Sequence, residues 1–421
     1  MRILSKSLLG IFLLTFAAVS WAACPEGTKN NYKGECVPIA GSGSTPSKKM
    51  DGIEFSISSH PIDFKARRAQ FLDLASKEDL NKRWYCSIFR DFKEIQIASD
   101  VAFSVPVQLA PTVEIFGESR STVSNPNPVG GQSTDPFMKS LYDLLAAYLY
   151  GTESATEMIY EGLLEGARTD AYSVITADAS ADSSWKWDEP TYYASMILWP
   201  LGYAYVLLVD EYGEDDPGVK EIKAWGDRLY VSSESKKVKW IGGGGFLKGP
   251  DRAALKAAAY SIWGNATGNE EALRRGYWYL QHAMKTVGRD GKDIYWGEDA
   301  EVRKMKKTLK MVGMTTGPAL YAAYALSLSG VDGIFEEAPK GGNIKEAIAW
   351  LIKRAKETKN KLYTKRFGYA TSMAYIELFM KLFPEHPVAV GEQAMRKDRT
   401  LYTVHIGGGA ATCFYRELKS A

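Results

Sequence analysis

The chain has 421 residues, 24% of them charged and 45% hydrophobic, and its 52 basic residues almost balance its 50 acidic ones to give a formal net charge of +2. A charge this close to neutral excludes the broad basic footprint of a nucleic-acid-binding protein, although a local basic cleft remains compatible with it. After the first two dozen residues no stretch is apolar for long enough to cross a bilayer, so the mature chain is expected to be soluble and without a membrane span.

The first 22 residues have the pattern of a secretory signal peptide. Arg2 and Lys6 precede an apolar run at residues 8–19, and Ala22 is a suitable residue for signal-peptidase cleavage. The run is too short for a transmembrane helix, which needs about 20 residues. We therefore predict a periplasmic or secreted protein. A lipid anchor on Cys24 is the less favoured alternative, because a tryptophan stands three positions before it, where lipoprotein signals carry an aliphatic residue.

Four cysteines in an exported chain predict disulfide bonds, for which three pairings are possible. Cys24 and Cys36 enclose a polar loop and are expected to form a local bond within a linker-like leader, residues 23–50, which is rich in Gly and Ser. Cys86 and Cys413 would then tie the first helical region to the last. No cysteine has metal-ligand spacing and the chain has only 4 histidines, so neither a metal site nor a cofactor is predicted.

Regular structure is expected to begin after a long irregular segment. Residues 119–136 are rich in Pro, Gly and Ser, which predicts a loop, and a loop of this length is either functional, such as a lid, or simply flexible. From residue 137 onward, helical stretches alternate with turns that contain Gly or Asn, and one long helical stretch is expected to be interrupted at Pro200.

Two kinds of helix are expected in the region after residue 137. One kind is amphipathic and charged, as in residues 343–357, whereas the other is rich in Ala and Gly with little charge, as in residues 251–266 and 317–329. A helix that is apolar on most sides is buried. Alternation of the two kinds predicts an all-α fold, an α/α-toroid (incomplete α/α barrel) with inner and outer helices, formed by one domain over residues 51–421. A helical solenoid would fit the same pattern, but no strict repeat period is present.

Five segments of the C-terminal region, taken in their order and spacing, resemble the alginate lyase (poly-mannuronate lyase) family, and the resemblance covers about residues 245–417. They are LKGPDRAALKAAAYSIWGNATGNEEAL, GEDAEVRKMKKTL, TTGPALYAAYALSLSGVD, FGYATSMAYIELF and YTVHIGGGAATCFYREL. The resemblance implies an α/α-toroid polysaccharide lyase that cleaves a uronate polymer by β-elimination.

Such a lyase removes the proton next to the uronate carboxylate, which requires a group that neutralises the carboxylate, a base and an acid. The family is understood to use an Asn-Asn-His motif, an Arg and a Tyr seven residues after that Arg. In this chain the motif positions hold Asp251, Arg252 and Ala253, the Arg position holds Lys307, and the Tyr position holds Met314. The acid and the base of the family are therefore absent from their expected positions.

Charged and aromatic residues of the matched segments are the remaining candidates. The candidate catalytic residues are Arg303, Lys307 and His405. The candidate substrate-binding residues are Asp251, Arg252, Lys256, Tyr260, Tyr295 and Glu301. A cation of this set would neutralise a uronate carboxylate, whereas the alternative for the Lys-rich run is a solvated helix face. A lysine within an Ala-rich helix must be paired or face a wet cavity. We expect Arg252, Lys256, Arg303, Lys307 and His405 to converge on one cleft.

The sequence therefore predicts a periplasmic polysaccharide lyase whose partner is an acidic, alginate-like polysaccharide. The first alternative is a non-catalytic glycan-binding or structural protein on the same scaffold. A glycoside hydrolase is the third possibility, and it is the least favoured because the adjacent Asp188 and Glu189 point apart and make a poor acid and base pair.

Overall fold

The computed structural model describes the helices, two short strands near the N-terminus and some connections, namely residues 28–30, 36–38, 53–77, 107, 109, 112–115, 134–177, 190–234, 250–285, 287–291, 302–336, 341–359, 373–395 and 408–416. The chain divides into two compact units, Met1–Asp51 and Gly52–Ala421. In the first unit, β1 (Thr28–Asn30) pairs antiparallel with β2 (Cys36–Pro38). The predicted signal peptide and Cys24 lie outside the described residues.

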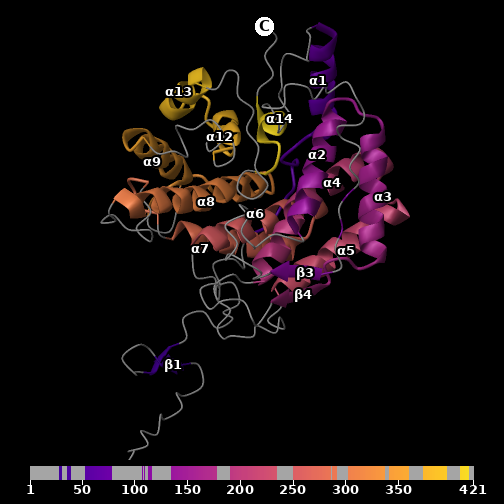
Figure 1. Cartoon of the computed structure of the whole chain (residues 1–421), viewed down its shortest axis with the longest axis horizontal. Coiled ribbons are helices and arrows are strands. Elements are labelled where there is room, and N and C mark those ends of the chain that lie inside the picture. Colours follow the sequence, from indigo (N-terminus) through magenta and orange to yellow (C-terminus); the bar gives the residue numbers. More distant parts are fainter. Residues whose placement is uncertain are drawn as a thin grey trace, which may run out of the picture. The chain divides into compact units, whose positions relative to one another are not determined.

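The second unit consists mainly of helices (Figure 1). In chain order its elements are α1 (Phe64–Lys77), β3 (Thr112–Ile115), α2 (Thr134–Leu149), α3 (Ser154–Arg168), β4 (Val174–Ala177), α4 (Pro190–Tyr212), α5 (Pro217–Glu234), α6 (Pro250–Thr267), α7 (Glu270–Met284), α8 (Val302–Ser327), α9 (Ile344–Glu357), α12 (Ile376–Leu382), α13 (Pro387–Met395) and α14 (Ala411–Tyr415). The strands β3 and β4 form a parallel pair.

Four helices, α2, α4, α6 and α8, form an inner layer. Every residue of α4 from 194 to 208 is buried, and so is every residue of α6 from 253 to 265. The inner helices contact one another in the order α2, α4, α6, α8, and α6 packs against both of its inner neighbours (Figure 1). This confirms that the two Ala- and Gly-rich stretches, residues 251–266 and 317–329, belong to inner helices.

The helices that alternate with them, α3, α5, α7 and α9, are amphipathic and form an outer layer. In α9 the buried residues recur every three or four positions, as in Ile344, Ile348 and Leu351, and charged residues occupy the other face. Such a helix buries a single stripe against the layer beneath it. The alternation of fully buried and one-sided helices confirms the predicted all-α fold with inner and outer helices.

The predicted interruption at Pro200 is wrong. Helix α4 runs without a break from Pro190 to Tyr212 and contains Pro200 near its middle. A proline inside a helix removes one backbone hydrogen bond and costs about 3 kcal/mol. Burial of the whole stretch 194–208 offsets this cost, because each buried large apolar side chain contributes about 1.5–3 kcal/mol.

The connections between inner and outer helices differ in length. An inner helix leads to the next outer helix through short turns at residues 150–153, 213–216 and 268–269, except that residues 328–343 separate α8 from α9. An outer helix is separated from the next inner helix by longer segments, residues 169–189, 235–249 and 285–301. Tyr148, near the end of α2, donates to Glu211, near the end of α4, at 2.9 Å, and Asn265, near the end of α6, donates to Ser329, just after α8, at 2.9 Å. Within each of these pairs the two inner helices therefore run parallel and start on the same face.

A C-terminal strap, residues 408–416, joins the first helices of the unit to the last. The Arg67 guanidinium on α1 donates to the Cys413 carbonyl at 2.9 Å, and Tyr415 shares a 2.7 Å hydrogen bond with Tyr203 on α4. On α12 the buried carboxylate of Glu377 forms an ion pair with Arg416 at 2.5 Å. Cys413 is disulfide-bonded. Its predicted partner, Cys86, lies outside the described residues.

Candidate functional site

The face on which the inner helices start carries the first predicted site residues. Asp251 and Arg252 stand in the first turn of α6, where Asp251 is buried and Arg252 is partly exposed. The first turn of a helix presents unpaired backbone N–H groups and a partial positive charge. The Asp251 carboxylate and the Arg252 guanidinium therefore both lie beside this partial positive charge.

Lys256, one and a half turns further along α6, takes part in a buried ionic network. Its ammonium lies 3.3 Å from the Glu234 carboxylate and donates to the Ser233 carbonyl at 3.1 Å. The same carboxylate pairs with Arg275 of α7 at 2.5 Å. The Lys256 side chain is only 3% exposed. A lysine in this Ala-rich helix had to be paired or to face a wet cavity, and the structure shows the first of these environments.

Tyr260 and Tyr279 complete this network, which we call the Glu234 network. Both phenols donate to the Glu234 carboxylate, at 2.8 Å and 2.9 Å. Burial would raise the pKa of Glu234, but the charges of Lys256 and Arg275 and the hydrogen bonds outweigh burial and lower that pKa below its usual value. Burial, followed by the charge of Glu234, raises the pKa of Tyr260 well above its usual value, so this tyrosine is neutral.

Arg303 and Lys307 lie in the first two turns of inner helix α8, one turn apart on one helix face. Their backbone is described, but their side chains are not. Because α6 and α8 pack against each other and start on the same face, the backbone of these two residues and of Arg252 belongs to neighbouring helix starts. The predicted site residues Tyr295, Glu301 and His405 lie outside the described residues. Convergence of the five cations on one cleft therefore stays a prediction.

Sequence reasoning missed three members of the Glu234 network, namely Glu234, Arg275 and Tyr279. They lie on α5 and α7, outer helices whose charges are expected to face solvent. The only signal was indirect, because a buried lysine at position 256 demanded a carboxylate partner. Which carboxylate it would be depended on how α5 packs beside α6, and spacing along the chain does not reveal that packing.

Aromatic side chains gather where the strap crosses the inner helices. Trp199 and Tyr203 of α4, Tyr321 of α8 and Tyr415 of the strap are fully or almost fully buried. Gly408 has a φ of +67°, and a Cβ added to it would lie 3.1 Å from Tyr321 and 3.2 Å from Trp199. The C-terminal strap therefore covers these aromatic side chains.

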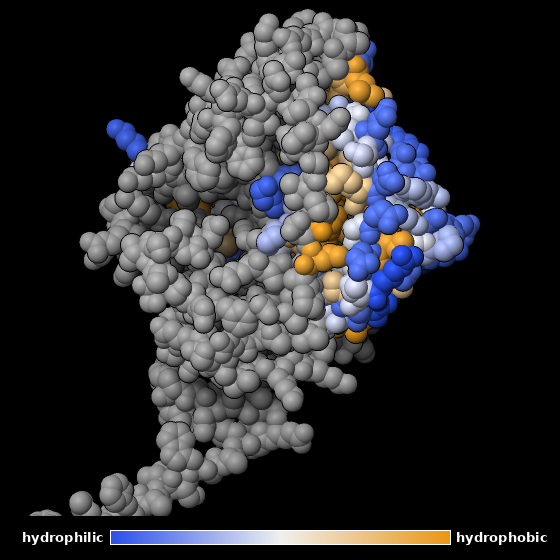
Figure 2. All heavy atoms as spheres, turned by 45° about the vertical axis from the view of Figure 1, so that its right-hand side comes forward, coloured by the Kyte–Doolittle hydropathy of each residue, from blue (hydrophilic) through white to orange (hydrophobic). Residues whose placement is uncertain are grey.

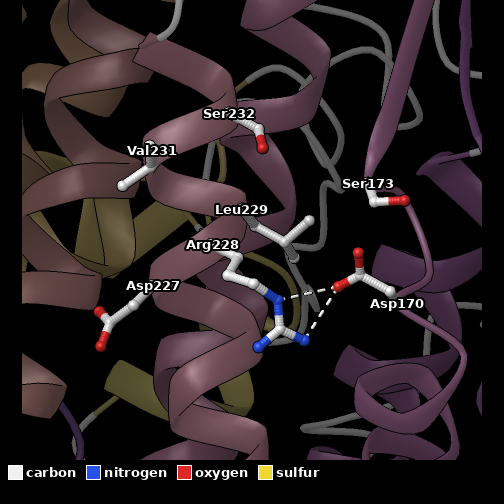
Figure 3. A pocket seen from close by; sticks show the side chains of 7 residues that line it. All are labelled: Asp170, Ser173, Asp227, Arg228, Leu229, Val231 and Ser232. Carbon is white, nitrogen blue, oxygen red and sulfur yellow. Dashed lines mark hydrogen bonds and ion pairs between the residues drawn. The ribbon is translucent and has the colours of Figure 1, made fainter.

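A separate hollow lies on the outer side of the unit and encloses about 440 Å³. The residues that line it come from α5 and from the segment that follows α3, namely Asp170, Ser173, Asp227, Arg228, Leu229, Val231 and Ser232 (Figure 3). Its cation, Arg228, is paired with Asp170 at 2.9 Å, which weakens it as an anion site. The described surface on the α3 and α5 side is mainly hydrophilic with small apolar patches between (Figure 2).

No protein-family model matches this chain, and no curated protein matches it. Several solved structures do match this chain. One is the ligand-free form of a histidine-to-alanine variant of alginate lyase A1-III, with a TM-score of 0.63 and 16% identity over 89% of this chain and 99% of that one. Another is a tyrosine-to-phenylalanine variant of the same lyase complexed with a tetrasaccharide, with a TM-score of 0.61 and 15% identity over 87% and 98% of the two chains.

The enzyme from Sphingomonas species A1 also matches, with a TM-score of 0.61 and 16% identity over 89% of this chain and 100% of that one. The chain has the fold of alginate lyase A1-III, an α/α-toroid. At this identity the likeness shows the fold alone, and it extends well beyond the C-terminal segments in which the sequence resemblance was visible. Within the described residues, no helix combines the length and apolarity that crossing a membrane requires, and no three His, Cys, Asp or Glu residues are grouped as metal ligands.

Proposed function

We propose that this chain is a polysaccharide lyase that cleaves a uronate-containing, alginate-like polymer by β-elimination. The observation that carries the proposal is the toroid fold, matched over nearly the full length of alginate lyase A1-III, one structure of which holds a tetrasaccharide. The positions of Arg252 at the start of α6 and of Arg303 and Lys307 at the start of the adjacent helix α8 support it, because such cations can bind the carboxylates of a uronate polymer.

In this proposal the side chains at the helix starts have separate roles. Arg303 or Lys307 neutralises the uronate carboxylate, which makes the neighbouring C–H more acidic, and Arg252 binds a second carboxylate of the polymer. His405 is the candidate base, since imidazole is the side chain that gains and loses a proton near neutral pH. The proton leaves the sugar carbon, a carbon–carbon double bond forms, and the glycosidic oxygen leaves with a proton from an acid.

We also propose that the chain acts in the periplasm or is secreted. The signal-like first 22 residues support this proposal. So does the disulfide bond of Cys413, because disulfides form and persist in oxidising compartments.

The test is a panel of uronate polymers incubated with the purified mature chain, followed by the ultraviolet absorbance of the unsaturated uronate product. Growth of that absorbance with an acidic polymer is the expected result. New reducing ends without the absorbance would identify a glycoside hydrolase instead. Binding without any product would identify a glycan-binding protein, an alternative favoured by the absence of the family's acid and base from their expected positions.

A further inference from the structure

Lys381 lies in the last turn of α12, and its ammonium is held against aromatic rings rather than against a carboxylate. Its Nζ is 5.5 Å from the centre of the Tyr324 ring on α8 and 5.7 Å from the centre of the Tyr415 ring on the strap. Glu377, one turn earlier on α12, pairs with Arg416 instead. Among the described residues, Lys381 therefore has aromatic neighbours but neither an ion pair nor a hydrogen bond.

The ammonium of Lys381 is reachable from solvent but is not fully hydrated. The residue is exposed, yet the protein around its ammonium, followed by the charge of Arg67, lowers the pKa of Lys381 below its ordinary value of 10.5. The Arg67 guanidinium is held nearby by the carbonyls of Cys413 and Arg416. A cation that has lost part of its water and faces a second cation is stabilised by an anion beside it.

A second donor next to Lys381 also lacks an acceptor. The Tyr324 hydroxyl makes no hydrogen bond within the part of the chain that the structure describes, whereas Tyr203 and Tyr415 share one at 2.7 Å. Burial raises the pKa of Tyr324, so its phenol keeps its proton and remains a donor at neutral pH. The ammonium and the phenol together could donate to the two oxygens of one small anion.

The Glu234 network shows which group is missing beside Lys381. The ammonium of Lys256 also lies over two tyrosine rings, 5.9 Å from the centre of Tyr260 and 5.4 Å from the centre of Tyr279. There the Glu234 carboxylate accepts hydrogen bonds from the lysine and from both phenols. The surroundings of Lys381 repeat the lysine and the tyrosines, and no carboxylate of the described residues joins them.

We propose that Lys381 and Tyr324 form a binding site for the carboxylate of a small molecule, of which a sugar acid is one example. The ammonium pairs with the carboxylate, the Tyr324 phenol donates to it, and the charge of Arg67 adds to the attraction. A ligand at this site would contact α8, α12 and the strap, because α12 packs against both α8 and α14. Its binding would therefore stabilise the attachment of the strap to α12.

The proposed carboxylate site is separate from the candidate site at the helix starts. Tyr324 stands 21 residues beyond Arg303 in α8, which is about 30 Å along the helix axis. The inference does not rest on the proposed function, since it concerns binding without turnover. A chain that cleaves no polymer could still have this site.

The test is hydrogen exchange of the purified mature chain with monomeric mannuronate, at constant ionic strength and with mannose as the neutral control. At about ten times the Kd of mannuronate, amides of residues 376–382 that exchange through opening of the site should exchange about tenfold more slowly. Mannose should leave them unchanged. Peptides covering residues 302–316 report separately on binding at the start of α8.

Three substitutions assign the protection to the site. Lys381→Met should raise the Kd measured from residues 376–382 at least roughly tenfold, the effect of losing a hydrogen bond to a charged group. Tyr324→Phe, which removes one hydroxyl, should raise it about threefold or more. Lys353→Met, at an exposed position of α9, is the matched control and should leave it unchanged.

Three results would overturn the proposal. The first is the absence of protection of residues 376–382 by mannuronate in the parent chain. The second is equal protection in the parent chain and in Lys381→Met. The third is tighter binding of inorganic phosphate than of mannuronate at these residues, because it would exclude a site built for a carboxylate. Should Lys381→Met fail to fold, unchanged protection in Tyr324→Phe would count against the proposal in the same way.

Discussion

Two buried carboxylates at distant positions in the chain are satisfied in different ways. Glu377 on α12 has no exposed surface and is matched by Arg416 of the strap, with a 2.8 Å hydrogen bond from Thr412. Glu234 forms ion pairs with two cations from two helices, Lys256 and Arg275. The first arrangement fastens the strap to α12. The second joins three helices, α5, α6 and α7, at one carboxylate, so the two ion pairs fasten different kinds of element.

Breaking the Glu377–Arg416 ion pair should cause the largest loss of unfolding free energy. Glu377→Ala leaves the Arg416 guanidinium, whose side chain is only 15% exposed, without its carboxylate, and breaking a buried pair in this way costs about 3–5 kcal/mol. Urea unfolding of the variant should show this loss of unfolding free energy. A loss below about 1 kcal/mol would mean that the pair behaves like a surface salt bridge.

The backbone conformation of the strap provides a second test of how much the strap contributes to the stability of the fold. Gly409 has a φ of +81°, and a Cβ added to it would lie 2.2 Å from Cδ1 of Tyr142, so Gly409→Ala should destabilise the fold by about 2–4 kcal/mol through strain and overpacking. Gly268 has a φ of +72° with no atom within 4 Å, so Gly268→Ala should cost only the strain, about 1–2 kcal/mol. Equal losses of unfolding free energy in the two variants would show that the strap adapts to the added methyl group.

Acid should weaken the Glu234 network. The folded-state pKa of Glu234 is lowered below its ordinary value of 4.5, so its stabilising contribution is present above that value and is lost as pH falls through the folded-state pKa. The difference in unfolding free energy between the parent chain and Glu234→Gln should therefore stay constant from pH 7 to about 5 and shrink as pH falls below the ordinary value of 4.5. A difference that stays constant below that value would contradict the lowered pKa.

The smallest effect on stability is expected from Lys256→Met. It removes one of the two cations that pair with Glu234 and leaves the pair with Arg275, so the unfolding free energy should change by less than about 1 kcal/mol. A loss as large as that of Glu377→Ala would show that the two networks do not differ in the way described above.

The fold was accessible from the sequence because inner and outer helices of a toroid differ in composition. Stretches such as residues 251–266 lack a polar face, so their burial on all sides follows from the sequence alone. The interruption predicted at Pro200 was wrong, because the tertiary burial of α4 outweighs the local helix-breaking preference of proline. A prediction made from neighbouring residues alone misses every position at which the free energy of tertiary packing outweighs the local conformational preference.

The candidate site was predictable only in part. The choice of Arg303 and Lys307 as candidates followed from the resemblance of their segment to the lyase family, and the structure places both in the first two turns of α8. The partners of Lys256 did not, because Glu234 and Arg275 reach it from two other helices and are separated from it along the chain. Such contacts are set by helix packing, which a periodic pattern of apolar residues does not specify.

The most direct test of the central claim, that an acidic polysaccharide binds where the inner helices start, is hydrogen exchange with and without a mannuronate oligosaccharide. Protection should appear in peptides covering residues 235–256 and 297–316, at the starts of α6 and α8. Residues 268–272 on the opposite face and residues 227–232 of the outer hollow should exchange unchanged. Protection confined to the outer hollow, or to the opposite face, would contradict the account.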